Sequence, residues 1–379
     1  MRPEFFGGFP GARFYGGEER DAVAEVVAAQ SPYRFYGLAL KGKAEELERR
    51  ACELFGRRHA VALSSGTSAL HAALFALGVG AGDEVIMPAY AWVSDLMAIL
   101  ALGGAPVIAP IDATLGLDAE RLGACCGERT RAILAVHMRG VPCDLPAIRD
   151  LARRRGIGVV EDGAQCLGGV VAGKPVGAGG DVSVLSFQYN KLITAGEGGM
   201  LLTDDPQLHE RAYRFHDLGM LRHAGGGDPE GLEAIASFGM NYRITELQAA
   251  LLLAQLEKLP RILGGLQASY AAALEMGAER LAALGLRERP TPPGAARNHA
   301  FLCLVAESPE AARQAAAALE DEGLPVQRCA RLDGHHVDVW EAYLQRTGLT
   351  YRSLAGEESR ARLERSLFLE VASVSVGAP

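Results

Sequence analysis

Between residues 59 and 161 the chain alternates between short apolar runs and longer amphipathic stretches. Runs with the length and composition of buried strands occur at 59–63, 84–87, 105–111, 131–137 and 158–161. Apolar residues at helical spacing occur at 18–29, 43–55, 66–77, 92–102, 119–125 and 145–155. Strands that alternate with helices form a parallel sheet with helices on both faces. The pattern therefore predicts an α/β fold, with three layers around a mainly parallel sheet.

Two further strands are predicted after this alternation, at 182–187 and 200–203. A polar connection joins them, and it contains Lys191 followed by the turn sequence GEGG. Asp205 and Pro206 then have the residue types of a helix N-cap and a first helical position. The two strands should extend the sheet and leave Lys191 at its edge.

The next region predicts a loop and then one long helix. Residues 221–239 are rich in glycine, which is typical of a loop. The helix should begin near Thr245, where Gln248 completes a capping box. Pro260 should kink or interrupt it, because proline has no N–H to donate within a helix.

The C-terminal third has a different pattern. A strand is predicted at 300–306, a helix at 308–322 and another strand at 325–329, which together indicate a small α+β unit. We therefore expect two domains: residues 1–259, a large domain that includes an N-terminal arm, and residues 260–379, a small C-terminal α+β domain.

Composition narrows the classes of function. The net charge of −8 and the lack of a long basic run argue against a nucleic-acid partner. Seven dispersed cysteines without CxxC spacing indicate reduced thiols, and no apolar run has membrane length, so we expect a cytoplasmic protein without membrane contact. His335 and His336 are adjacent, and on a strand they would point in opposite directions, so we expect no metal site.

Candidate chemistry is concentrated where the predicted strands end. The residues there are Ser65-Gly66-Thr67, Tyr90, His137, Asp162 and Lys191. Because parallel α/β sheets bind ligands beyond the carboxyl ends of their strands, these side chains should converge.

Each of these features allows a functional and a purely structural interpretation. The Lys191 amine can form a Schiff base with a carbonyl group, or it can be an ordinary loop lysine. Ser65-Gly66-Thr67 can bind a phosphate at a helix N-terminus, or it can simply cap the helix. Asp162 needs a cationic partner such as a pyridinium nitrogen, and Trp92 is either a stacking face or a core aromatic. Together they satisfy what pyridoxal phosphate requires of a protein.

Four segments carry a resemblance to a known family. They are SSGTSALHAALFALGVGAGDEVIMPAYAWVSD, VVEDGAQCLGG, SFQYNKLITAGEGGM and MNYRITELQAALLLAQLEKL. In order and spacing, the region from about Tyr15 to Leu259 resembles the DegT/StrS-type sugar aminotransferases. This family is pyridoxal-phosphate-dependent and has the aspartate-aminotransferase fold (fold type I).

The resemblance implies roles for several residues around the cofactor ring. Lys191 matches the lysine that holds the cofactor through an imine, and Asp162 matches the carboxylate paired with the pyridine nitrogen. Gln165 matches the side chain near the ring hydroxyl, and Trp92 matches the aromatic residue that stacks on the ring.

The resemblance also implies the phosphate contacts. Gly66, Thr67 and Ser186 match residues that contact the phosphate within one subunit. Asn241 matches a residue that reaches the phosphate bound in the neighbouring subunit, so the resemblance implies a homodimer with shared active sites.

Three further residues are weaker candidates for substrate contacts. Tyr90 follows a predicted strand, His137 ends one, and Arg243 lies close after Asn241 in the resembling segment. His137 is more often a satisfied polar residue than a base, and Arg243 can equally hold a substrate or form a structural ion pair.

The expected reaction is transamination to a ketone on a sugar, cyclitol or related molecule in specialised metabolism. The resemblance implies glutamine or glutamate as the amino donor. The acceptor stays open, because relatives that act on nucleotide sugars carry a His- and Pro-rich loop where this chain reads CARLDGHHVDVWEAYL. Alternatives are a dehydratase or an aminohydroxybenzoate-synthase-like enzyme of the same fold, and a non-catalytic accessory protein. A nucleotide-dependent oxidoreductase is disfavoured, because SSGTSAL lacks the GxGxxG pattern.

Overall fold

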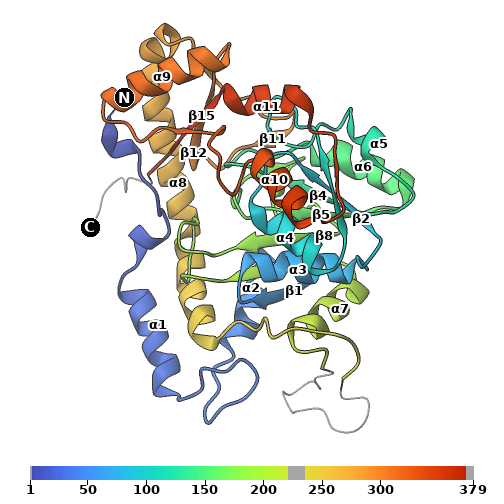
Figure 1. The fold of residues 1–379 in the computed structure, drawn as a ribbon. Coiled ribbons are helices and arrows are strands. Elements are labelled where there is room, and N and C mark those ends of the chain that lie inside the picture. The colour runs from blue at the N-terminus through green and yellow to red at the C-terminus, as the bar shows by residue number, and fades with distance from the viewer. Residues whose placement is uncertain (1, 221–234, 373–379) are drawn as a thin grey trace.

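The computed structural model describes residues 2–220 and 235–372, and its main feature is an eight-stranded sheet (Figure 1). In spatial order the strands are β1 (His59–Leu63), β9 (Gly199–Thr203), β8 (Val182–Ser186), β5 (Gly158–Asp162), β4 (Thr130–Val136), β2 (Glu84–Pro88), β3 (Ala105–Ala109) and β14 (Arg352–Ser353). The strands from β8 to β14 are parallel, whereas β9 is antiparallel to both of its neighbours. The mainly parallel sheet expected from the sequence is confirmed.

Successive residues of each strand pack on opposite faces of this sheet, as the two-residue period of a strand requires. In β4, Leu134 lies in a core with α3 (Gly66–Ala76), α4 (Val93–Ala101) and α7 (Pro206–His216), whereas Ile133 packs with α6 (Leu145–Arg155). In β1, Val61 lies in the first core and Ala60 packs with α2 (Lys43–Phe55) and α8 (Glu246–Ala283). This is the predicted three-layer arrangement.

The helix starts follow the capping residues in the sequence. Asp205 accepts hydrogen bonds from the first turn of α7, and Thr245 and Gln248 form the capping box of α8. The helix expected at 119–125 is shorter, a single turn from Leu122 to Cys125 (α5). The Asp118 carboxylate accepts the N–H groups of Glu120 and Arg121, and this turn replaces the expected first helical residues.

Of the two outcomes expected at Pro260, a kink or an interruption, the interruption is wrong, because α8 continues through that residue to Ala283. Pro260 is exposed, so its missing hydrogen bond falls on the solvent side of the helix. On the opposite side, Leu259, Ile262 and Leu266 are buried in the core shared with α2. This burial outweighs the roughly 3 kcal/mol that an internal proline costs a helix.

Most strands of the C-terminal third form a second sheet, in keeping with the predicted α+β unit, whereas β14 belongs to the large sheet. The second sheet is antiparallel, in the order β10 (Arg287–Glu288), β12 (Phe301–Val305), β15 (Ser366–Glu370), β13 (Gln327–Arg328). The other elements are α1 (Gly17–Ala28), α9 (Pro309–Asp321), α10 (Val337–Thr347), α11 (Gly356–Glu364), the 3-10 turns η1 (Pro3–Phe5) and η2 (Ala12–Phe14), and a small sheet of β6 (Val170–Val171), β7 (Lys174–Pro175) and β11 (Ala295–Ala296). The division into two domains at residue 259 stays a prediction.

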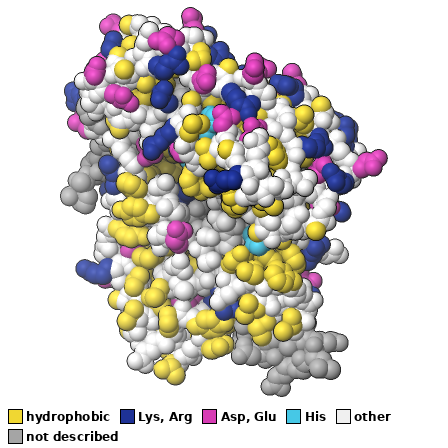
Figure 2. All heavy atoms as spheres, in the orientation of Figure 1, with side chains coloured by type: hydrophobic (Ala, Val, Ile, Leu, Met, Phe, Trp, Pro, Cys, Tyr) yellow, Lys and Arg dark blue, Asp and Glu magenta, His cyan; other side chains and the backbone are white. Residues whose placement is uncertain are grey.

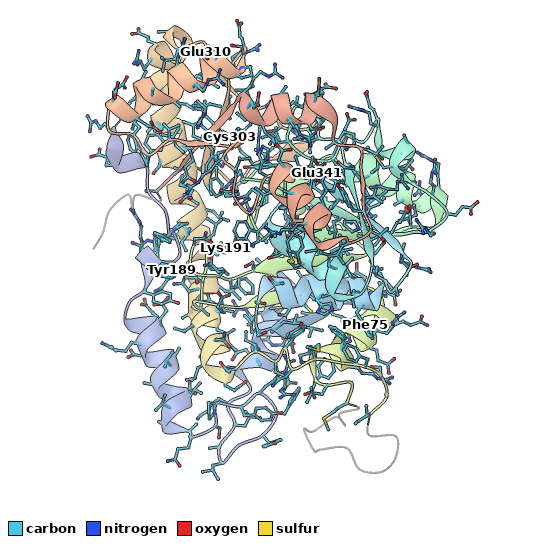
Figure 3. The ribbon with its side chains drawn as sticks, in the orientation of Figure 1. Phe75, Tyr189, Lys191, Cys303, Glu310 and Glu341 are labelled. Atoms are coloured by element: carbon cyan, nitrogen blue, oxygen red, sulfur yellow. The ribbon has the colours of Figure 1, made fainter. Side chains whose placement is uncertain are left out.

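The N-terminal segment ties the two sheets together near the middle of the molecule. Gly7 N–H donates to the carbonyl of Glu370 on β15 (2.9 Å), and Gly11 N–H donates to the carbonyl of Lys191 (3.2 Å). Lys191 therefore lies centrally, between the large sheet and the C-terminal sheet (Figure 3). Most of the loop expected at 221–239 lies outside the described residues. Within the described residues, no helix combines the length and apolar character of a membrane span.

Candidate active site

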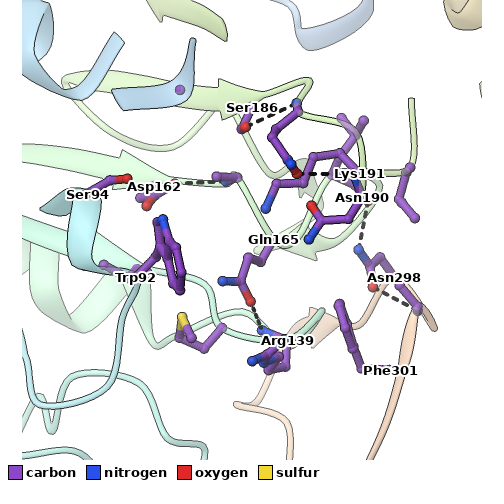
Figure 4. A pocket seen from close by; sticks show the side chains of 18 of the residues that line it. Trp92, Ser94, Arg139, Asp162, Gln165, Ser186, Asn190, Lys191, Asn298 and Phe301 are labelled. Carbon is purple, nitrogen blue, oxygen red and sulfur yellow. Dashed lines mark hydrogen bonds between the residues drawn. The ribbon is translucent and has the colours of Figure 1, made fainter. Parts of the chain in front are cut away.

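A cavity of about 540 Å³ lies where β4, β5 and β8 end (Figure 4). These strands are parallel neighbours, so their carboxyl ends meet at one edge of the sheet. Of the sequence candidates, the cavity wall contains Gly66, Thr67, Trp92, Asp162, Gln165, Ser186 and Lys191. Residues that were more than 100 positions apart in the chain are thus brought around one space, as the strand-end argument expected.

Lys191 is held in the connection between β8 and β9. Its N–H donates to the Gln188 carbonyl (2.9 Å), and its own carbonyl accepts from Gly11. Burial lowers the pKa of the Lys191 amine to about 8; the Arg139 charge acts in the same direction, and the Asp162 carboxylate opposes it. A sizeable fraction of this amine is therefore neutral near physiological pH, which makes it a candidate nucleophile and base.

Asp162 is the last residue of β5 and is 4% exposed. One carboxylate oxygen accepts the N–H of Ala164 (2.8 Å). Burial raises the pKa of Asp162, whereas the Ala164 N–H and the charge of Lys191 favour its ionised form. The neighbouring carboxyl group of Asp95, at the start of α4, is also fully buried and lies in the same wall.

The N-terminus of α3 forms another part of the wall. Ser65 caps the helix by accepting the N–H of Ser68 (3.0 Å), and the next residues, Gly66 and Thr67, begin its first turn. A side chain at residue 66 would place its first carbon 2.8 Å from Cβ of Ser186, so this close approach requires glycine. First-turn N–H groups and hydroxyls suit an anion such as a phosphate.

Trp92 and Gln165 line the space between these parts (Figure 4). The Trp92 ring is 44% exposed, so it is an available aromatic face rather than a core residue. The side-chain oxygen Oε1 of Gln165 accepts the backbone N–H of Arg139 (3.3 Å). The side-chain nitrogen Nε2 of Gln165 lies 3.4 Å from Nε2 of His335. The Gln165 amide is thereby fixed in orientation.

His137 lies behind the cavity and is a satisfied core residue. Its Nδ1 accepts the Cys143 N–H (3.0 Å), so its Nε2–H donates to Glu161 (3.1 Å). Burial alone would raise the pKa of Glu161, but hydrogen bonds from His137, Ser183 and Gly179 outweigh it and lower this pKa to about 2. The substrate role considered for His137 has no support from this geometry, because the side chain is fully buried outside the cavity wall.

The other expected substrate residues also lie outside the cavity wall. Tyr90 is fully buried, with its hydroxyl 3.4 Å from Nε of Arg139. Arg243 forms an ion pair with Asp217 and lies over the ring of Tyr33, which is the structural alternative considered for it. Asn241 is exposed and does not line the cavity of its own chain.

Among the cavity residues that the sequence analysis did not predict are Asp95, Arg139 and His335. Arg139 follows the end of β4 by three residues, so its position after a strand was a usable signal. The expectation that His335 and His336 lie on a strand is wrong: His336 caps α10, and Asp333 accepts both N–H and Nδ1–H of His335, which turns its ring into the cavity. The described residues contain no group of three metal-ligating side chains.

Comparisons with known proteins agree with this arrangement. The model of the DegT/DnrJ/EryC1/StrS aminotransferase family matches residues 19–339. The solved structure of an aminotransferase from Psychrobacter cryohalolentis is 27% identical, with a TM-score of 0.84 over 98% of this chain and 95% of that chain. 3-Amino-5-hydroxybenzoic acid synthase is 26% identical, with a TM-score of 0.80 over 100% of this chain and 95% of that chain.

A third solved structure is similar in fold alone. The GDP-4-keto-6-deoxy-D-mannose-3-dehydratase of E. coli, solved with bound hydrated pyridoxal phosphate, is 20% identical. Its TM-score is 0.82, over 98% of this chain and 97% of that chain. The fold therefore occurs in enzymes with different outcomes, and the residues of the site must decide between them.

The hydrogen bonds to Glu161 predict a pH-dependent contribution to stability. The pKa of Glu161 is about 2 in the fold, against 4.5 ordinarily. Above about pH 4.5 the charged carboxylate therefore stabilises the fold by on the order of 3 kcal/mol. This stabilisation is lost as the pH falls towards 2. Glu161→Gln should therefore lower the free energy of unfolding at neutral pH, and less so at about pH 4. Denaturant titrations measure this, with exposed Glu53→Gln as control. A loss of the same size at both pH values would contradict the assignment.

Proposed function

The chain belongs to the DegT/DnrJ/EryC1/StrS aminotransferase family, and we propose that it transfers an amino group from glutamine or glutamate to a ketone on a sugar, cyclitol or related small molecule. It is a pyridoxal-phosphate-dependent aminotransferase. The observation that carries the proposal is the convergence of a low-pKa lysine, a buried carboxylate and a helix N-terminus on one cavity.

The residues of the cavity fit pyridoxal phosphate. The first turn of α3 and Ser186 would hold the phosphate, in the narrow space that only a glycine at position 66 leaves open. Asp162 would face the pyridine nitrogen, Trp92 would cover one face of the ring, and Gln165 would lie near its hydroxyl. When bound, the cofactor supplies an aldehyde that condenses with amines and a ring that withdraws electrons from the substrate carbon.

Lys191 is the residue to which we assign the proton transfers. Its pKa of about 8 leaves part of the population neutral, so Nζ can accept a proton from a substrate carbon, and as an ammonium group it can return that proton elsewhere. Its backbone contacts to Gln188 and Gly11 fix where the side chain begins. Both directions of transfer therefore use one amine in one cavity.

Asp162 holds the complementary charge. Its carboxylate is buried and hydrogen-bonded to Ala164 N–H, so it is oriented before any ligand enters. A fixed negative charge in a place from which water is excluded stabilises a proton on a nearby ring nitrogen, and so favours electron withdrawal from the substrate. Lys191 and Asp162 are the catalytic pair in this proposal.

Transamination is favoured over the other outcomes on particular residues. By resemblance, dehydratases of the family carry histidine where this chain has Lys191. A non-catalytic accessory protein would not need a lysine of lowered pKa directed into a cavity beside a buried carboxylate. An aminohydroxybenzoate-synthase-like reaction remains the second candidate, because the match to such a synthase covers 100% of this chain and 95% of that chain.

We further propose that two copies of the chain complete each other's sites, with Asn241 reaching the phosphate end of the partner's cavity. The Tyr242 carbonyl accepts the Ser64 N–H (2.8 Å), so this segment runs beside the residues that precede α3. Asn241 itself is exposed, and so are the neighbouring Phe238 (66%) and Met240 (36%). Hydrophobic side chains gather on the lower half of the face in Figure 2, which suits a surface that another subunit covers.

A panel of donors and acceptors tests the reaction. Purified holoenzyme should transfer nitrogen from L-glutamine or L-glutamate to at least one ketone among keto-sugars and keto-cyclitols, with the aminated product detected by mass spectrometry. Lys191→Ala should give no product with the same panel. Loss of a hydroxyl group without nitrogen transfer would instead indicate a dehydratase, and the proposal would then be wrong.

Chemical trapping tests the role of Lys191. Borohydride reduction of the holoenzyme should fix the pyridoxyl group to this amine, because it is the lysine of the cavity wall. Peptide mass mapping locates the modification, and Lys191→Arg serves as the control that should stay unlabelled. A pyridoxyl group on Lys258 or on another lysine would refute the assignment.

Complementation tests the shared site. A Lys191→Ala chain co-expressed with an Asn241→Ala chain should regain a fraction of wild-type activity, because one site of the heterodimer then has both native residues. Lys191→Ala paired with Ser186→Ala is the matched control, since Ser186 and Lys191 line the cavity of the same chain and no site is restored. Purified heterodimer without activity in the first pairing would exclude the proposed crossing.

A further inference from the structure

Arg139 places an unpaired positive charge in the cavity wall (Figure 4). Its Nε lies 3.4 Å from the Tyr90 hydroxyl, and one terminal nitrogen lies 3.3 Å from Nε2 of His335. The guanidinium carbon lies 3.9 Å from the centre of the Phe368 ring and 5.5 Å from that of Phe301. All of these partners are neutral, so they orient the guanidinium group without balancing its charge.

No described carboxylate of the region pairs directly with this charge, although Arg139 helps to lower the pKa of Asp333 from behind His335. Glu197 and Glu370 line the same cavity, and Asp333 accepts a hydrogen bond from Nδ1–H of His335. Within residues 2–220 and 235–372, none of these three forms an ion pair with Arg139. A cation that is largely removed from water without a carboxylate in direct contact is unfavourable. Its presence therefore indicates an anion that enters with a ligand.

The backbone at Arg139 is also held in an uncommon conformation. Its φ of 52° lies in the left-handed region, which is disfavoured for residues other than glycine. The Gln165 side chain accepts the Arg139 N–H, and the Gln165 carbonyl accepts the Gly140 N–H (3.0 Å). These two hydrogen bonds fix the residue beside Gln165, and such locally strained residues concentrate at ligand sites.

We propose that Arg139 binds a carboxylate group of a substrate and so makes the cavity selective for anionic molecules. The proposal rests on the proposed aminotransferase function, because it concerns the substrates of that same cavity. The planar guanidinium fork suits a carboxylate, and the phenyl rings of Phe301 and Phe368 hold the fork in place. The cofactor phosphate is assigned to the α3 end, so this carboxylate belongs to the amino donor or to the keto acceptor.

Equilibrium binding tests the subsite without turnover. Glutarate, which has the carbon skeleton of glutamate without its amino group, is titrated into the holoenzyme by calorimetry, and glutaramide is the uncharged counterpart. Arg139→Met should weaken glutarate binding by about 10- to 100-fold and leave glutaramide binding unchanged. Arg139→Lys should lie between, and the exposed Arg346→Met should behave as wild type. Wild-type affinity of Arg139→Met for glutarate would overturn the proposal.

The half-reaction with L-glutamate shows which substrate supplies the carboxylate. It is followed by the change in cofactor absorbance after one mixing. If Arg139→Met slows this half-reaction at subsaturating glutamate, the donor carboxylate is the ligand. If glutarate affinity falls while this half-reaction is unchanged, the acceptor carries the carboxylate. If the proposed function is wrong but the carboxylate subsite is right, the wild-type enzyme will bind glutarate and yet show no transamination. The two failures can therefore be told apart.

A second observation, independent of Arg139, concerns Asp95 in the first turn of α4. The residue is 0% exposed, and neither carboxylate oxygen has a hydrogen-bond donor among the described residues. Burial and the charge of the adjacent Asp162 carboxyl raise the pKa of Asp95 well above its ordinary value, whereas the nearby backbone N–H groups of Trp92 and of Asp95 itself act in the opposite direction. Lys191 and His137, the other titratable groups that act on the pair, lower the pKa of Asp162.

Two buried carboxyl groups in contact cannot both be ionised without a large electrostatic cost. Asp162 has a donor in Ala164 N–H and a favourable charge in Lys191, so it is the better carboxylate of the two. With a proton on Asp95, its hydroxyl donates to Asp162, which gives one of the two unpartnered oxygen atoms a partner. The pair then carries one negative charge in total.

We infer that Asp95 is a protonated positioning residue, which donates a hydrogen bond to Asp162 and keeps Asp162 ionised and aimed at the cofactor. It does not itself touch the reacting atoms. Asparagine can donate the same hydrogen bond without titrating, whereas alanine cannot. The two substitutions therefore separate a neutral donor from a charged carboxylate.

Infrared spectroscopy of the holoenzyme detects the proton directly. The wild type should show the C=O stretch of a protonated carboxyl at a pH where exposed carboxyls are ionised, and Asp95→Asn should lack it, with Asp118→Asn as control. Asp95→Asn should keep the wild-type cofactor absorbance and its pH titration, whereas Asp95→Ala should shift that titration. Absence of the band from the wild type would overturn the inference, even if the variants do not fold.

Stability gives a second readout. Folding of the wild type takes up one proton at Asp95, since the pKa of Asp95 is higher in the fold than in the unfolded chain. Its free energy of unfolding should therefore fall, relative to that of cofactor-saturated Asp95→Asn, as pH rises above about 4. A difference that does not vary with pH would mean that no proton is taken up, and would contradict the inference.

Discussion

The buried carboxylate of Asp162 is the constraint around which the site is arranged. A charge at this depth is tolerated only if donors and cations surround it. The chain provides the N–H of Ala164, the amine of Lys191 and the carboxyl of Asp95, all in one cavity wall. Lys191 depends on the same balance, because burial and Arg139 lower its pKa while Asp162 limits that decrease.

The fold determines that these groups meet. Strands β4, β5 and β8 are parallel neighbours, so their carboxyl ends meet at one edge of the sheet. Arg139 follows β4, Asp162 ends β5 and Lys191 follows β8, and all three therefore lie in one cavity wall. The C-terminal sheet contributes the rings of Phe301 and Phe368, which orient Arg139 from the other side. The cavity thus has an end suited to a phosphate, a centre suited to a ring, and a cationic wall that remains for a substrate.

The sequence predicted the sheet, most helices and the central residues of the site, because strand ends and capping residues are local signals. It could not show on which side of a strand end a side chain lies, so Tyr90 and His137 were candidates although both are buried outside the cavity wall. Asp95 and His335 were missed because their roles depend on contacts with Asp162, Gln165 and Arg139, which are distant in the chain. The continuity of α8 through Pro260 likewise depends on its burial against other elements.

The most direct test of this account is the single-turnover reaction of Asp162→Asn with L-glutamate. The variant should fold and retain cofactor, but it should convert the bound cofactor at least about 100-fold more slowly than wild type, because a neutral amide no longer stabilises a proton on the ring nitrogen. The measurement is repeated in the Asp95→Asn background, so that the neighbouring carboxyl cannot take over the charge. A rate close to that of the wild type in both backgrounds would contradict the central role of Asp162.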